Sequence, residues 1–176
     1  EVHRFDKNEF LRSVTIYDYD ANAADKNIDK PIAIHQSIDL AADQYATTIM
    51  QYGTGRITLP DGSVLNTDIE TTIDPVKNKM ESYYDAQGRL IRSTQYKPDD
   101  PDSDNPVYTE MATTWSTYDS QGRLRVMEVT TTSTNHTRQQ FTANIYMGSS
   151  SLLLHSIQAD VDQIDDFDDF YTLTGL

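Results

Sequence analysis

The chain has 176 residues and no cysteine, and its 14 basic and 28 acidic residues give a formal net charge of −14 at pH 7. This length fits one domain with a core of its own, and the lack of thiols excludes disulfides, thiolate catalysis and cysteine-ligated zinc. The charge disfavours nucleic acid and anionic membranes as partners. It favours a basic protein, a cation or a neutral ligand, and it is equally consistent with a role in solubility alone.

The first half of the chain alternates apolar and polar residues with the period of a half-buried strand. This pattern predicts strands at 13–17, 57–59 and 64–65. The last two are joined by Leu59-Pro60-Asp61-Gly62, in which proline presets the turn and glycine accepts a left-handed conformation. The sequence therefore predicts a β-hairpin over 55–72.

The segment 39–52 has two interpretations. Asp39 is suited to cap a helix that would end at Gly53, whereas Thr47, Thr48 and Ile49 favour a strand. Both alternatives stay open.

The second half of the chain is also typical of strands. We expect strands at 109–118, 124–132, 140–147 and 151–158, with turns at 133–138 and 148–150. The segment 97–106 holds three prolines and four aspartates and predicts a long exposed loop. The fold class is therefore mainly β, an antiparallel meander of hairpins that forms a curved sheet, with one or two short helices at most.

The C-terminal segment 160–176 differs from the β-rich domain predicted over 1–159. Its apolar residues recur every three to four positions between aspartates, which is typical of an acidic amphipathic helix or of a disordered acidic tail. Such a helix would cover the protein's own sheet or bind a partner with a basic rim. The candidate partner-binding residues are Asp165, Asp166, Phe167, Phe170 and Tyr171.

One motif occurs twice. Tyr84-Asp85-Ala86-Gln87-Gly88-Arg89-Leu90 is repeated as Tyr118-Asp119-Ser120-Gln121-Gly122-Arg123-Leu124. The aspartate is suited to begin and cap a type I turn, and the glycine to take the left-handed position that forms a bulge. Each copy is therefore expected to form a hairpin tip, with its arginine and leucine starting the return strand and its tyrosine lying near that strand.

The motif resembles the YD-repeat of RHS-type bacterial toxins and related surface proteins. In that family, hairpins stack side by side into a long, curling sheet that can close into a shell around a toxin. The resemblance covers 14 of 176 residues, and two copies are too few for a shell. It implies hairpin geometry and a bacterial, exported or envelope setting. The same motif can also arise independently, as a good hairpin sequence.

Candidate chemistry is sparse. The four histidines lack the spacing of a helical metal site, and the chain has neither a G-x-S-x-G elbow nor a phosphate-binding glycine loop. Two aspartate-rich segments resemble part of a calcium loop, in which ligands alternate along the chain. The stronger is Asp100, Asp102 and Asp104, and the weaker comprises Asp18, Asp20 and Asn22. No cofactor is expected, although calcium could bind these loops.

These observations predict a non-enzymatic binding protein with a basic protein partner, in the bacterial envelope or as an immunity or accessory protein of an exported toxin. A periplasmic or extracellular location goes with this hypothesis, although the start at Glu1 fits either a removed leader or trimming. The alternatives are a structural surface protein stiffened by calcium and a carboxylate-based hydrolase. No aliphatic run is long enough to span a bilayer as a helix.

Overall fold

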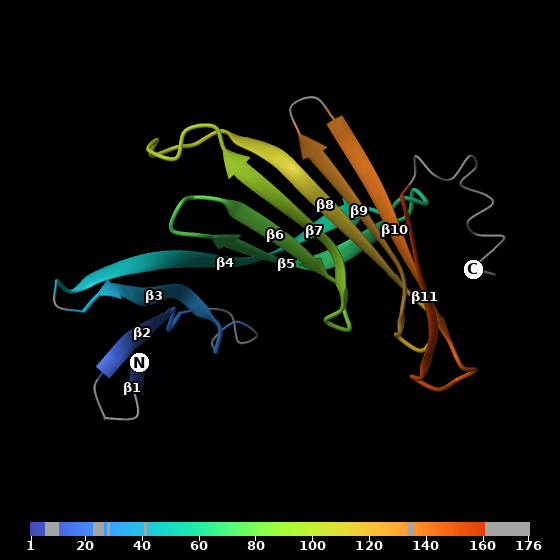
Figure 1. Ribbon diagram of the computed structural model, residues 1–176, viewed down its shortest axis with the longest axis horizontal. Helices are drawn as coiled ribbons and strands as arrows, with labels where there is room; N and C mark the ends of the chain where they lie inside the picture. The colour runs from blue at the N-terminus through green and yellow to red at the C-terminus, as the bar shows by residue number, and fades with distance from the viewer. Residues whose placement is uncertain (6–10, 23–26, 28, 41, 134–135, 161–176) are drawn as a thin grey trace.

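The structure is a computed structural model, and it describes residues 1–5, 11–22, 27, 29–40, 42–133 and 136–160. Eleven strands form one open, curved antiparallel sheet in which each strand pairs with its neighbours in the sequence (Figure 1). The described residues contain no helix that could cross a membrane. The strands are β1 (Val2–Phe5), β2 (Leu11–Tyr19), β3 (Pro31–Asp39), β4 (Gln44–Thr58), β5 (Val64–Ile73), β6 (Lys79–Tyr84), β7 (Leu90–Pro98), β8 (Tyr108–Tyr118), β9 (Leu124–Ser133), β10 (His136–Tyr146) and β11 (Leu153–Asp160).

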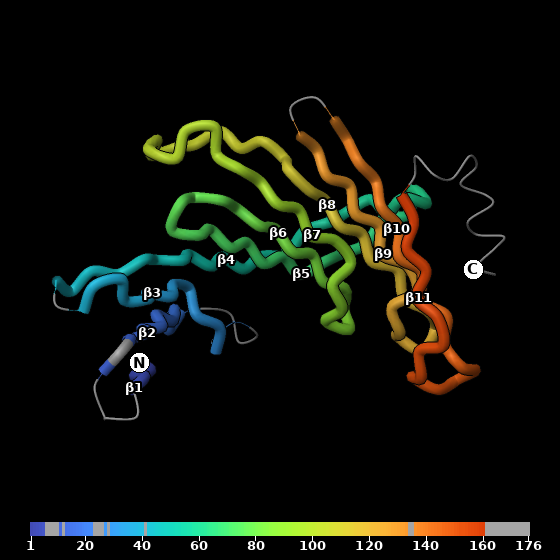
Figure 2. The backbone as a smooth tube through the Cα atoms, viewed as in Figure 1, coloured from blue at the N-terminus to red at the C-terminus, as the bar shows by residue number. Residues whose placement is uncertain are grey.

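The predicted antiparallel meander is therefore confirmed, and the path of the chain is easily followed in Figure 2. The hairpin predicted over 55–72 is the central part of the β4–β5 pair, which extends from Thr58↔Val64 to Ile49↔Ile73. The turn predicted over 133–138 is shorter than expected, because Ser133 and His136 already pair across it.

The helix alternative for 39–52 is wrong, because residues from Gln44 onward belong to β4. Ile49 pairs with Ala33 of β3 on one side and with Ile73 of β5 on the other. A strand with a partner on each side satisfies its backbone groups on both sides, and β-branched residues are well suited to such a position.

Few side chains in this sheet are fully buried. The main apolar cluster consists of Val126, Phe141 and Ala143, with Ala159 packed against it. Polar side chains also lie in the buried layer, where Thr94 and Thr113 form a hydrogen bond between their hydroxyls at 3.1 Å. Because the core is small, each large apolar residue in it carries a large share of the stability.

The two copies of the repeated motif form the predicted hairpin tips. In the first, the Gly88 amide donates to the Asp85 carbonyl at 2.9 Å, and the Asp85 amide donates to the Arg89 carbonyl at 3.0 Å. The Asp85 carboxylate accepts hydrogen bonds from the amides of Gln87 and Arg89 at 2.9 Å and from Arg89 Nε at 2.6 Å. The second copy repeats this pattern around Asp119 with the same distances.

Neighbouring tips are tied together by their arginines and tyrosines. The Arg89 guanidinium lies 4.9 Å from the ring centre of Tyr118, whose hydroxyl donates to the Leu90 carbonyl at 2.9 Å. The Arg123 guanidinium lies 4.7 Å from the Tyr146 ring, whose hydroxyl donates to the Leu124 carbonyl at 3.0 Å. Tyr118 and Tyr146 therefore each pack on the tip of the hairpin before their own.

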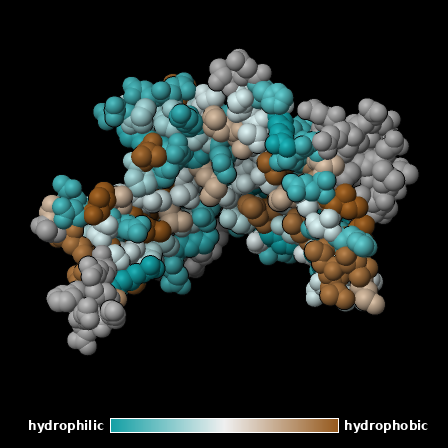
Figure 3. Space-filling view, viewed as in Figure 1, coloured by the Kyte–Doolittle hydropathy of each residue, from teal (hydrophilic) through white to brown (hydrophobic). Residues whose placement is uncertain are grey.

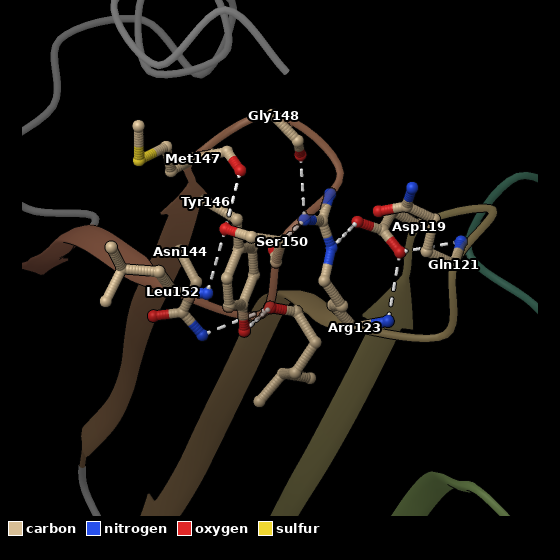
Figure 4. Close-up of polar contacts among 10 residues, drawn as sticks. Asp119, Gln121, Arg123, Asn144, Tyr146, Met147, Gly148, Ser150 and Leu152 are labelled. Carbon is tan, nitrogen blue, oxygen red and sulfur yellow. Dashed lines mark hydrogen bonds and ion pairs between the residues drawn. The ribbon is translucent and has the colours of Figure 1, made fainter.

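The tip between β10 and β11 takes part in the same arrangement without the full motif. Figure 4 shows Arg123 between Asp119 and this tip, where its guanidinium donates to the carbonyls of Gly148, at 2.9 Å, and Ser150. Tyr146 and Leu152 have the spacing of the repeat, but methionine replaces its aspartate. The structural repeat thus extends one hairpin further than the sequence repeat.

The glycines of the two tips are expected to be essential for turn stability. Gly88 and Gly122 have φ angles of 74° and 78°, where an L side chain costs about 1–2 kcal/mol. We expect Gly88→Ala and Gly122→Ala each to lower the free energy of unfolding in urea by about 1 kcal/mol. Gly53→Ala is the control, because its new Cβ meets no atom within 4 Å. Equal losses in all three variants would contradict this account.

Candidate functional site

One row of residues crosses the inner face of the sheet. Cross-strand pairing places Arg92 of β7 opposite Trp115 of β8, Trp115 opposite Glu128 of β9, and Glu128 opposite Phe141 of β10. Residues directly opposite in an antiparallel sheet share a face. These four side chains therefore lie side by side on one face of the sheet.

This face is concave. Leu65 of β5 and Phe141 of β10 line the same cavity of about 680 Å³, although five strand spacings would separate them by about 24 Å in a flat sheet. The curvature thus brings distant strands around one pocket. Its lining is Leu59, Pro60, Asp61, Leu65, Asp85, Ala86, Gln87, Arg89, Ile91, Trp115, Ser116, Thr117, Tyr118, Val126, Glu128 and Phe141.

Hairpin tips form the rim of this pocket. Leu59 to Asp61 come from the β4–β5 tip, and Asp85 to Arg89 come from the first copy of the repeat. Both tips are fixed by their own hydrogen bonds, since Asp61 accepts from the amide and hydroxyl of Ser63 at 2.9 and 2.7 Å. The rim is therefore preformed, as is usual for ligand pockets.

Glu128 is the carboxylate of this pocket that lacks a partner. It lies half-buried between Trp115 and Phe141, and it forms no hydrogen bond or ion pair with another described residue. Burial raises its pKa, and no neighbouring charge or hydrogen bond offsets this effect. The other two lining carboxylates differ, because Asp61 is bonded to Ser63 and Asp85 to Arg89.

A guanidinium already packs beside this site. Arg92 lies between two aromatic rings, 5.1 Å from the centre of Trp115 and 5.6 Å from that of Tyr83. Its Nε is buried without a hydrogen-bond partner, so its contacts with the rings are the main interactions that hold it. Arg92 thereby helps to fix the orientation of Trp115.

Glu81, on the same face, shows how a satisfied carboxylate differs from Glu128. It accepts hydrogen bonds from Lys79 at 2.9 Å, Tyr83 at 2.8 Å and Tyr96 at 3.2 Å. Burial acts to raise its pKa, but these three partners together lower it. Burial and the hydrogen bond to Glu81 raise the pKa of Tyr83 to about 12. The negative charge of Glu81 is thus already compensated by partners within the fold.

A second apolar surface lies at the β10–β11 tip and along the edge strand β11. It is visible as a brown group at the lower right of Figure 3. Its exposed members are Met147, Leu152, Leu153, Leu154 and Ile157. This surface contains no acidic side chain, and it is a weaker candidate for a basic partner than the pocket.

The described structure gives no support to the calcium prediction. Asp100, Asp102 and Asp104 lie in the loop between β7 and β8, and no group of three or more acidic or histidine side chains among the described residues could hold a metal ion. Asp100 instead caps its own turn by accepting from the Asp102 amide at 2.9 Å. Asp18 accepts from His35 Nε2 at 3.0 Å.

The predicted partner-binding residues of the C-terminus lie outside the described residues. They are Asp165, Asp166, Phe167, Phe170 and Tyr171. The pocket around Trp115 and Glu128 was not predicted from the sequence. The available signal was a glutamate two positions after Val126, which places a charge on a buried face of a strand.

No family model, no curated protein and no solved structure matches the chain.

Proposed function

We propose that this chain is a non-enzymatic binding protein that holds a basic protein partner against the concave face of its sheet. The observation that carries the proposal is the preformed pocket of about 680 Å³, which is lined by three carboxylates and one basic residue, Arg89. Arg89 is itself paired with Asp85. A partner with positive charge at its contact surface is therefore complementary to this face.

The distribution of charge over the rest of the chain supports the same proposal. Several basic side chains are engaged within the fold, in the pairs Lys79–Glu81, Arg89–Asp85, Arg123–Asp119 and Arg138–Asp160. Since acidic residues outnumber basic ones by two to one, an excess of negative charge remains even if every basic residue is paired with a carboxylate. Such a surface accelerates association with a basic protein, and the acceleration weakens as salt rises.

The pocket's chemistry favours binding over hydrolysis. A paired-carboxylate mechanism needs two carboxyl groups that are free to act on the substrate. Asp61 and Asp85 are both committed to hairpin tips, which leaves Glu128 alone. Within the same proposal, the YD-like tips favour an exported bacterial protein, either an envelope component or an immunity or accessory protein of a toxin, in the periplasm or outside the cell.

The test is affinity capture from an extract of the source organism with the full chain as bait, washed at low and at high salt. We expect one basic protein, retained stoichiometrically and released by high salt. Retention of no protein, or of proteins that salt does not release, would contradict the proposal.

A matched pair of variants then tests which face of the sheet binds the partner. Thr117→Arg places a positive charge in the pocket, whereas Thr131→Arg places the same charge on the opposite face, because the strand alternates. We expect Thr117→Arg to weaken binding at least tenfold and Thr131→Arg to change it little.

A further inference from the structure

We propose that the concave pocket receives one basic side chain of the partner, with its aliphatic stem against Trp115 and its cationic end on Glu128. This inference rests on the proposed function and specifies the residue type that the partner inserts. The shared chemistry is an organic cation on an apolar stem, which lysine and arginine both provide.

The walls of the pocket suit the stem of such a side chain. Leu65, Ile91, Val126 and Phe141 supply apolar surface, and Trp115 supplies a broad aromatic face. Long basic side chains pack their methylene groups on surfaces of this kind and keep the charged end at a polar group. An aromatic face beside the site also attracts the cation directly.

The charges around the pocket favour a cation and direct it to Glu128. Arg89 is neutralised by Asp85, with Nε 2.6 Å from the carboxylate. Arg92 packs between Trp115 and Tyr83 and does not line the pocket. An incoming cation therefore meets one unpaired carboxylate and no unpaired basic residue of the pocket lining.

The half-buried, unpaired carboxylate of Glu128 explains why this pocket would bind a cation in preference to a neutral ligand. A carboxylate that is partly removed from water without a partner lowers the stability of the fold, and a charge-assisted hydrogen bond compensates for that loss. A neutral ligand of the same shape fills the apolar walls but leaves Glu128 unpaired. A site with a buried polar group of this kind rejects ligands that cannot pair with it.

Trp115 provides the readout, because it is the single tryptophan of the chain. Its fluorescence is titrated with n-propylguanidinium and n-butylammonium, which correspond to the arginine and lysine side chains, and with neutral 1-pentanol. We expect the cations to bind at least tenfold more tightly than the alcohol. The tighter of the two cations indicates whether the partner inserts arginine or lysine.

Two variants test whether Glu128 is responsible. Glu128→Gln should abolish the preference for cations while the melting temperature stays the same or rises, because the substitution removes an unpaired, half-buried charge. Asp61→Asn removes a different carboxylate of the same pocket, one already bonded to Ser63, and should keep the preference.

Equal binding of cations and alcohol, or a cation preference that survives in Glu128→Gln, would overturn this inference. Neither result bears on the capture experiment, because salt-dependent retention of a basic partner does not require Glu128. Failed capture would overturn the proposed function, whatever the titration shows.

Discussion

Phe141→Ala is expected to lower the free energy of unfolding by about 3–5 kcal/mol, which is typical for the loss of a buried phenylalanine ring. Phe141 is 3% exposed and lies in the small cluster with Val126 and Ala143. Among the described residues, the single curved sheet has no second layer to close around the cavity that the substitution leaves. Urea unfolding followed by circular dichroism measures the change.

The matched control removes the same ring from an exposed position. Phe5 of β1 is 59% exposed, and Phe5→Ala should change the free energy of unfolding by no more than about 0.5 kcal/mol. Similar losses in the two variants would show that the cluster around Phe141 is not the core of the protein.

Asp85→Ala is expected to lower the free energy of unfolding by about 2–3 kcal/mol. Asp85 is 5% exposed, and its carboxylate accepts bonds from two backbone amides and the Arg89 side chain. The substitution leaves all three donors without their acceptor. The control is Asp100→Ala, which removes a turn-capping aspartate from an exposed loop and should cost much less.

Acid unfolding gives a second readout of the Asp85 variant. Burial acts to raise the pKa of Asp85, but the hydrogen bonds from Arg89 and Gln87 lower it below the usual 3.8. Because the pKa is lower in the folded state, the stabilisation is complete above the unfolded-state value and is lost as pH falls through the folded-state value. Asp85→Ala should therefore reduce the decline in stability below about pH 4. An unchanged acid profile would contradict this role.

The hairpins could be predicted from the sequence because their signals are local. A motif such as Tyr118-Asp119-Ser120-Gln121-Gly122-Arg123-Leu124 contains the turn's cap, its left-handed residue and its return strand within seven positions. The contact of Arg123 with Tyr146 could not be predicted, because it joins neighbouring hairpins. The 39–52 segment was ambiguous for the same reason, since pairing with both β3 and β5 made it a strand.

The pocket was missed because its position depends on which face of the sheet is concave. Val126 and Glu128 share one face of β9, whereas Met127 and Val129 share the other, and both pairs contain apolar residues. Alternation alone therefore cannot show that Glu128 lies on the inner side. The curvature that joins Leu65 to Phe141 across five strand spacings becomes visible only in three dimensions.

The most direct test of the concave-face proposal is hydroxyl-radical footprinting of the protein with and without its captured partner. The proposal predicts that Trp115 and Tyr118, which line the pocket, become protected, whereas Met147 and Leu154 at the β10–β11 hairpin keep their reactivity. Protection of Met147 and Leu154 with Trp115 unchanged would place the partner on the edge strand and contradict the proposal.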